Sequence, residues 1–140
     1  AKAPLNSTQE LATLVKESIP AATRRTGGNP AKRTFQALRI EANDELGAIT
    51  RALPIALDLI TVGGRVVVMS FQSLEDRIVK KIFVDRTTSK TPRNLPVDLP
   101  EFAAKFVMVS KSGETPNDQE LADNPRSASV RLRAIEKVAA

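Results

Sequence analysis

The sequence predicts an α/β fold, and three observations indicate that class. Apolar residues recur at helical spacing from residue 35 to residue 60. An apolar run of strand length, rich in β-branched residues, follows at residues 66–71. A second helical pattern starts directly after that run. With 140 residues, of which 41% are hydrophobic, the chain has the size of one compact domain.

A short amphipathic helix is predicted near the start of the chain. Ser7 and Glu10 have the spacing of a capping box, in which each side chain satisfies a backbone N–H at the first turn. Apolar residues then recur at helical spacing until Pro20, which ends the pattern.

The second helix carries the strongest periodic signal. Asn29 is its predicted N-cap and Pro30 its first helical residue. At 100° per residue, the apolar positions of this pattern fall within about 60° of one direction. They are Phe35, Leu38, Ala42, Leu46, Ile49, Leu53, Leu57 and Ile60. We therefore predict one buried stripe, with a break or kink between Glu45 and Pro54 caused by Gly47 and Pro54.

The apolar run at residues 66–71 predicts a strand that is covered on both faces. Gly63 and Gly64 form the turn before it. Burial of both faces is typical of parallel strands in α/β sheets. Ser73 and Asp76 then predict the N-cap of a helix whose inward face holds Leu74, Ile78 and Ile82.

Two further strands are predicted, at residues 105–110 and 130–138, with a short helix at residues 118–123 between them. The connection is short, so these two strands are expected to be antiparallel to each other. The strand at residues 66–71 then lacks parallel partners. We expect the rest of its sheet to lie upstream in the gene or to come from a second copy of the chain, as a homodimer. The chain also begins without Met, which is consistent with a processed end, a tag remnant or a piece of a longer protein.

Composition excludes several classes of function. The chain has no Cys and no His, which removes disulfides, thiol nucleophiles, imidazole bases and the usual zinc sites, and no metal site is predicted. No apolar run approaches the roughly 20 residues of a membrane span, and no secretory signal pattern is present, so we expect a cytoplasmic protein without a membrane partner. Lys and Arg outnumber Asp and Glu by 21 to 16, which favours polyanionic partners.

The first candidate site is a basic stretch. Residues 18–40 contain no acidic residue, and their cations are Arg24, Arg25, Lys32, Arg33 and Arg39. On the helical wheel, a polar strip of Lys32, Gln36, Arg39 and Asn43 flanks the apolar stripe. One interpretation is a solvated helix shoulder on which Arg39 and Asn43 tie neighbouring segments together. The other is an RNA-binding face, because Arg and Lys neutralise phosphates while Gln and Asn pair with base edges.

The second candidate site lies at the carboxyl end of the buried strand, where open α/β sheets bind ligands. Its polar residues are Ser70, Gln72, Ser73, Glu75 and Asp76. They are interpreted either as helix-capping groups or as part of an active-site wall. The glycines fit neither GxGxxG nor GxxxxGK[ST], so a nucleotide-type cofactor must bind elsewhere.

Three segments resemble a known family in both sequence and order. They are residues 29–46 (NPAKRTFQALRIEANDEL), 63–81 (GGRVVVMSFQSLEDRIVKK) and 124–138 (NPRSASVRLRAIEKV). Together they resemble the C-terminal half of the small-subunit (16S) rRNA cytosine-N4 methyltransferases, the RsmH or MraW family. Their span covers nearly the whole chain.

The resemblance implies the end of a Rossmann-like class I methyltransferase domain, with about three strands of which the last two are antiparallel. Residues 1–46 would then belong to an inserted helical substrate-recognition domain and residues 47–140 to the methyltransferase domain. The S-adenosyl-L-methionine loop would lie upstream, which would leave this chain inactive alone. The implied substrate is the N4 amine of a cytidine in small-subunit rRNA, reached on an exposed or flipped base.

Carried over to this chain, the resemblance places Lys32, Arg33, Gln36, Arg39 and Asn43 toward RNA. It places Ser70, Gln72, Ser73, Glu75 and Asp76 along the cleft, and it leaves the catalytic residue unknown. Asn29 and Gln72 stand where many members have His, so a His-based proton transfer or metal role is in doubt at both positions. The alternative function is a non-catalytic RNA-binding or ribosome-assembly module.

Overall fold

The computed structural model describes residues 4–20, 29–92, 97, 99–110 and 112–140. Contacts within it divide the chain into two compact units, Ala1–Glu45 and Leu46–Ala140. We call them the N-terminal unit and the C-terminal unit, and each is described by itself. None of the described helices is both long and apolar enough to cross a membrane.

The N-terminal unit contains helices α1 (Thr8–Ser18) and α2 (Lys32–Asn43). The predicted cap of α1 is confirmed, since Ser7 Oγ accepts a hydrogen bond from the Glu10 N–H at 3.1 Å. The predicted start of α2 is two residues too early. Asn29 Oδ1 accepts from the Ala31 N–H at 2.9 Å, which closes a turn ahead of the helix, and Pro30 lies in that turn.

The predicted division of this helical run is confirmed, but the break lies at Asp44, just before the predicted range of Glu45 to Pro54. Asp44 has φ +48° and the left-handed conformation, which Asp tolerates better than most residues. Helix α3 (Glu45–Leu59) starts directly after it. Gly47 and Pro54, the expected causes of a break, both lie inside α3. The stripe is buried only in part: Leu53 is 7% exposed in α3, whereas Leu38 of α2 is 51% exposed.

The C-terminal unit is built around a three-stranded antiparallel sheet of order β1-β3-β2. The strands are β1 (Arg65–Ser70), β2 (Phe106–Met108) and β3 (Arg131–Lys137). The predicted antiparallel pairing of the last two strands is confirmed. The predicted turn is also confirmed: Gly63 has φ +82°, which glycine adopts readily, and the Gly64 N–H donates to the Thr61 carbonyl at 2.9 Å.

The expectation of parallel pairing and two buried faces for β1 is wrong for this sheet. β1 is an edge strand that pairs antiparallel with β3. Its side chains alternate between exposed and covered, with Val67 58% and Met69 56% exposed. Val107 in β2 and Val109, just after that strand, are also half exposed. The sheet thus has one face packed by helices and an opposite face on which several apolar side chains are half exposed.

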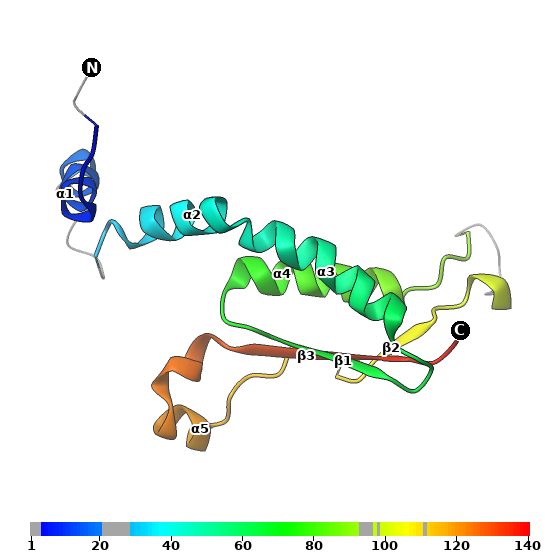
Figure 1. The fold of residues 1–140 in the computed structure, drawn as a ribbon. Coiled ribbons are helices and arrows are strands. Elements are labelled where there is room, and N and C mark those ends of the chain that lie inside the picture. Colours follow the sequence, from blue (N-terminus) through cyan, green and yellow to red (C-terminus); the bar gives the residue numbers. More distant parts are fainter. Residues whose placement is uncertain (1–3, 21–28, 93–96, 98, 111) are drawn as a thin grey trace. The chain divides into compact units, whose positions relative to one another are not determined.

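Figure 1 shows α3 and α4 (Ser73–Thr87) side by side over the packed face of the sheet. The buried core between them and the sheet consists of Leu53, Leu57, Val79, Phe83, Phe106 and Ile135. Helix α4 buries Val79 and Phe83, whereas Leu74, which we expected to point inward, is 40% exposed. The cap of α4 is Gln72 and not Ser73, so the predicted start of the helix was one residue late.

Helix α3 is anchored at its C-terminal end by the last strand. Lys137 Nζ donates to the carbonyl of Ile60 at 2.9 Å, and it lies 6.0 Å from the centre of the Phe106 ring. A cation at this end of a helix meets the negative end of its dipole. The remaining short elements are η2 (Pro100–Phe102), α5 (Asp118–Asp123) and η3 (Pro125–Ser129), of which α5 was predicted.

Candidate functional site

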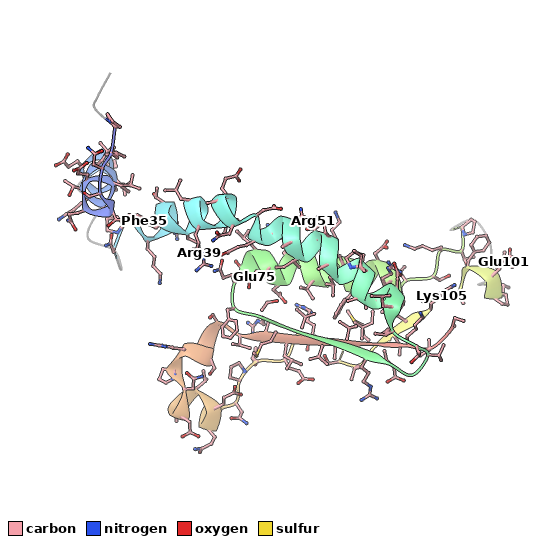
Figure 2. The ribbon with its side chains drawn as sticks, in the orientation of Figure 1. Phe35, Arg39, Arg51, Glu75, Glu101 and Lys105 are labelled. Atoms are coloured by element: carbon pink, nitrogen blue, oxygen red, sulfur yellow. The ribbon has the colours of Figure 1, made fainter. Side chains whose placement is uncertain are left out.

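The predicted active-site wall is a compact group at the junction of β1 and α4. Ser70 is the last residue of β1 and is 3% exposed. Glu75, in the first turn of α4, turns back toward the strand (Figure 2). Its Oε2 accepts from the N–H groups of Phe71 at 3.1 Å and of Gln72 at 3.2 Å. Glu75 therefore stabilises the chain reversal between strand and helix as the carboxylate of a capping box.

Asp76 is held in a bidentate ion pair with Arg133 of β3. Arg133 Nε lies 2.6 Å from Asp76 Oδ1, and Arg133 Nη2 lies 3.0 Å from Oδ2. The side chains are only 12% and 19% exposed, respectively. Hydrogen bonds from Arg133 hold the pKa of Asp76 below its usual range, and the same contact raises the pKa of Arg133. Asp76 is thus ionised at neutral pH with both carboxylate oxygens engaged, an arrangement that suits positioning better than proton transfer.

Arg133 is a site residue that sequence reasoning missed. It pairs with Val68 across the strands, which places it on the face that α4 covers. Gly113 packs against its guanidinium: a Cβ at that position would lie 3.0 Å from Cζ of Arg133. The only sequence signal was a charged residue among the apolar positions of β3, between Leu132 and Ala134. Its partner Asp76 is 57 residues away in sequence, so the pairing itself left no local pattern.

The predicted basic strip is organised around one acidic residue in the N-terminal unit. Arg39 Nη2 donates to Glu45 Oε2 at 3.0 Å, and Asn43 Nδ2 lies 3.5 Å from Glu45 Oε1. Arg39, labelled in Figure 2, nevertheless keeps 54% of its side chain exposed. Lys32 and Arg33 are exposed, and Gln36 is half-buried. The predicted residues Arg24 and Arg25 lie outside the described part of the chain.

The two predicted sets belong to different units and are therefore described separately. The strip from Lys32 to Asn43 lies in the N-terminal unit, and the group from Ser70 to Asp76 lies in the C-terminal unit. Among the described residues, no three acidic side chains gather in a way that could hold a metal ion. The chemistry that these groups offer is polar recognition and phosphate neutralisation.

Comparison with known proteins decides the family. The model of the MraW methylase family matches residues 1–138. The chain belongs to the MraW methylase family. This membership confirms the resemblance carried by the three sequence segments, and it agrees with a mixed helix and strand fold that contains a small sheet.

Several curated proteins of this family share more than half of their aligned residues with the chain. The protein named ribosomal RNA small subunit methyltransferase H from Rhodococcus jostii is 55% identical to the chain over 139 residues. The protein of the same name from Corynebacterium diphtheriae is 57% identical to it over 135 residues. The Mycobacterium marinum protein of the same name is 56% identical over 135 residues. These alignments cover 99%, 96% and 96% of the chain but only 41%, 40% and 34% of the respective relatives. The chain therefore spans about two fifths of the relatives that it matches.

Proposed function

We propose that the chain is the C-terminal part of an S-adenosyl-L-methionine-dependent methyltransferase that modifies the N4 amine of a cytidine in small-subunit rRNA. The observation that carries this proposal is the family match over residues 1–138, together with relatives named as small-subunit rRNA methyltransferases. Such an enzyme acts where ribosomes are made, which supports a cytoplasmic location and the rRNA or small ribosomal subunit as its partner.

The incomplete sheet supports a larger Rossmann-like domain. β1 is an edge strand, and the apolar face formed by Val67, Met69, Val107 and Val109 is exposed. Large exposed apolar patches mark surfaces that another element covers. We infer that an upstream part of the same protein pairs with β1 and covers this face. Residues 1–46 would then belong to an inserted substrate domain and residues 47–140 to the methyltransferase domain.

A homodimer is a different way to complete the same sheet. In that case β1 of one copy would pair with an edge of the second copy. Sedimentation of the full-length protein distinguishes the two arrangements, because a sheet completed within one chain does not require a dimer.

We propose that the cofactor binds outside this chain. No Gly-rich phosphate or dinucleotide loop can be drawn from its six glycines. The residues of the chain therefore do not fit the main S-adenosyl-L-methionine site, and we assign none of them to it. In this proposal the isolated chain is inactive.

The C-terminal unit would contribute one wall of the reaction cleft. N4 methylation would form a bond from the amine nitrogen to the methyl carbon of S-adenosyl-L-methionine and break the bond between that carbon and the cofactor's sulfur. It would release S-adenosyl-L-homocysteine and one amine proton. Glu75 accepts from two backbone N–H groups and Asp76 is locked to Arg133. Both carboxylates therefore hold the wall in shape, and the proton acceptor is a group other than these two. Gln72 and Ser73 would supply the polar surface of this wall, and the buried Ser70 would lie beneath that surface. Gln72 would offer an amide to the base or its amine.

The basic strip on α2 would bind the RNA. The side chain of Arg39 is half exposed, and its ion pair with Glu45 orients it. Lys32 and Arg33 would neutralise phosphates, while Gln36 and Asn43 would reach base edges. We extend this assignment to Arg24 and Arg25, which continue the same basic stretch in the sequence.

A second function, a non-catalytic RNA-binding or ribosome-assembly module, is favoured by the net charge of +5 in a chain without a cofactor loop. A methyl-transfer assay separates the two functions. The full-length protein is incubated with isotope-labelled S-adenosyl-L-methionine and small-subunit rRNA, and the nucleosides are analysed by mass spectrometry, with large-subunit rRNA as the control. We expect labelled N4-methylcytidine in the small-subunit rRNA alone. Binding of that rRNA without any label would favour the assembly module.

A further inference from the structure

A basic groove lies between α3 and α4, on the side of these helices that faces away from the sheet. It encloses about 880 Å³ and lies within the C-terminal unit. Thr50 and Pro54 line it from α3. From α4, the cations Arg77, Lys80 and Lys81 line it together with the apolar Ile78, Ile82 and Val84. None of these residues was singled out by the sequence patterns as a site.

The cations of the groove share one face of α4. Arg77, Lys80 and Lys81 are related by i, i+3 and i+4 spacing, so their Cβ atoms are neighbours about 5–6 Å apart. All three are exposed, whereas Val79 and Phe83 on the opposite side of the helix are fully buried. Because the buried side fixes how α4 sits on the sheet, this cationic face is held toward solvent.

The acidic side chains around the groove are already engaged. Asp58 of α3 accepts two hydrogen bonds from Arg86, at 2.6 and 3.2 Å, and this contact lowers the pKa of Asp58. Asp85 is bonded to Lys90 at 2.5 Å.

Asp76, which lies close enough to Lys80 to feel its charge, is bonded to Arg133. No ion pair to Arg77, Lys80 or Lys81 occurs within the described ranges. These three cations therefore have no ion-pair partner there, although the charge of Lys80 acts on Asp76 and that of Lys81 acts on Asp85.

We propose that this groove is a second RNA contact, which binds phosphates of the rRNA substrate away from the target cytidine. The inference rests on the proposed function and adds a contact that is separate from the strip on α2. Charge complementarity supports it, because three adjacent cations on an exposed helix face match consecutive phosphates. The groove thus adds affinity and fixes the register of the RNA, while sequence choice lies elsewhere.

The test compares three variants of the full-length protein by their affinity for transcribed small-subunit rRNA at several salt concentrations. The variant R77Q/K80Q/K81Q removes the cationic face. The variant R65Q/K105Q/R126Q removes the same charge from residues that do not line the groove. The variant R77K/K80R/K81R keeps the charge and exchanges the side chains.

We expect the neutralised groove variant to lower the slope of log affinity against log salt by about 2, since each lost phosphate contact removes about 0.7 to 0.9. Binding at low salt should weaken roughly tenfold, because each exposed charge contact contributes a few-fold. The other two variants should keep the wild-type slope. If the triple variant melts early, the single variants K80Q and K81Q replace it, with an expected loss of about 0.7 in slope each.

An unchanged slope and affinity in the groove variants would overturn the inference, and would leave an acidic protein segment as the remaining class of partner. Methylation of the same rRNA by the wild-type protein separates this result from a failure of the proposed function. A wild-type protein that methylates the rRNA while the groove variant binds it equally well refutes only the groove. A wild-type protein that transfers no methyl group refutes the proposed function.

Discussion

The ion pair between Asp76 and Arg133 gives the sharpest stability prediction for the C-terminal unit. At an effective dielectric constant of about 20, unit charges 4 Å apart attract by about 4 kcal/mol, which is an upper bound before desolvation is subtracted. The two side chains are 19% and 12% exposed, so both desolvation and attraction are substantial. We expect a coupling of about 2 kcal/mol in the double-mutant cycle of Asp76→Asn and Arg133→Gln.

Each single substitution should lower the free energy of unfolding by more than this coupling energy. Asp76→Asn leaves a largely buried guanidinium without its counter-charge, and the expected loss is about 2–4 kcal/mol. The pH dependence follows from the lowered pKa of Asp76. The contribution of the ion pair to the free energy of unfolding is fully present above about pH 4, the ordinary range for the pKa of aspartate. It is lost as the pH falls through the lower pKa of Asp76 in the folded state. The difference between wild type and Asp76→Asn should therefore shrink in acid.

The assay is native-state hydrogen exchange by mass spectrometry on the full-length protein. Peptides that cover β3 report the opening free energy of the sheet directly. This choice suits a chain that has no Trp or Tyr as a fluorescent probe. A coupling below about 0.5 kcal/mol, or a cost of Asp76→Asn that is independent of pH, would refute the view that this pair holds the cleft wall.

Two further predictions concern the core and the basic strip. Leu57→Ala should lower the opening free energy by about 2–5 kcal/mol, because Leu57 is fully buried, while Leu59→Ala, at a residue 78% exposed, should have almost no effect in the same exchange experiment. Arg39→Ala should weaken rRNA binding a few-fold without lowering the melting temperature, because its side chain is 54% exposed and its ion pair joins it to Glu45, only six residues away. Unchanged affinity with a collapsed melting temperature would contradict the RNA-binding role.

The elements that sequence could predict are those set by local chemistry. The cap at Ser7, the turn at Gly63 and the strand β3 each depend on a few neighbouring residues, and each lies where the pattern indicated. The helix break was predicted later in the chain than Asp44, where it occurs, because Gly47 and Pro54 have lower helix propensities than Asp. Pro54 is nonetheless accommodated inside α3.

The features that sequence could not predict depend on distant neighbours. A continuous apolar run does not say which strand lies beside it, so β1 was expected to have parallel partners although it pairs with β3. The same limit applies to the candidate site. Glu75 and Asp76 are adjacent in sequence, but only the packing of α4 against β3 assigns one to a cap and the other to Arg133.

We propose that this chain is one part of a methyltransferase whose cofactor site lies elsewhere in the protein. A calorimetric titration with S-adenosyl-L-methionine tests it, with this 140-residue chain and the full-length protein measured side by side. We predict binding by the full-length protein and no heat of binding with the chain alone. Binding by the chain alone would contradict the account, since it would place the cofactor on residues that carry no Gly-rich loop.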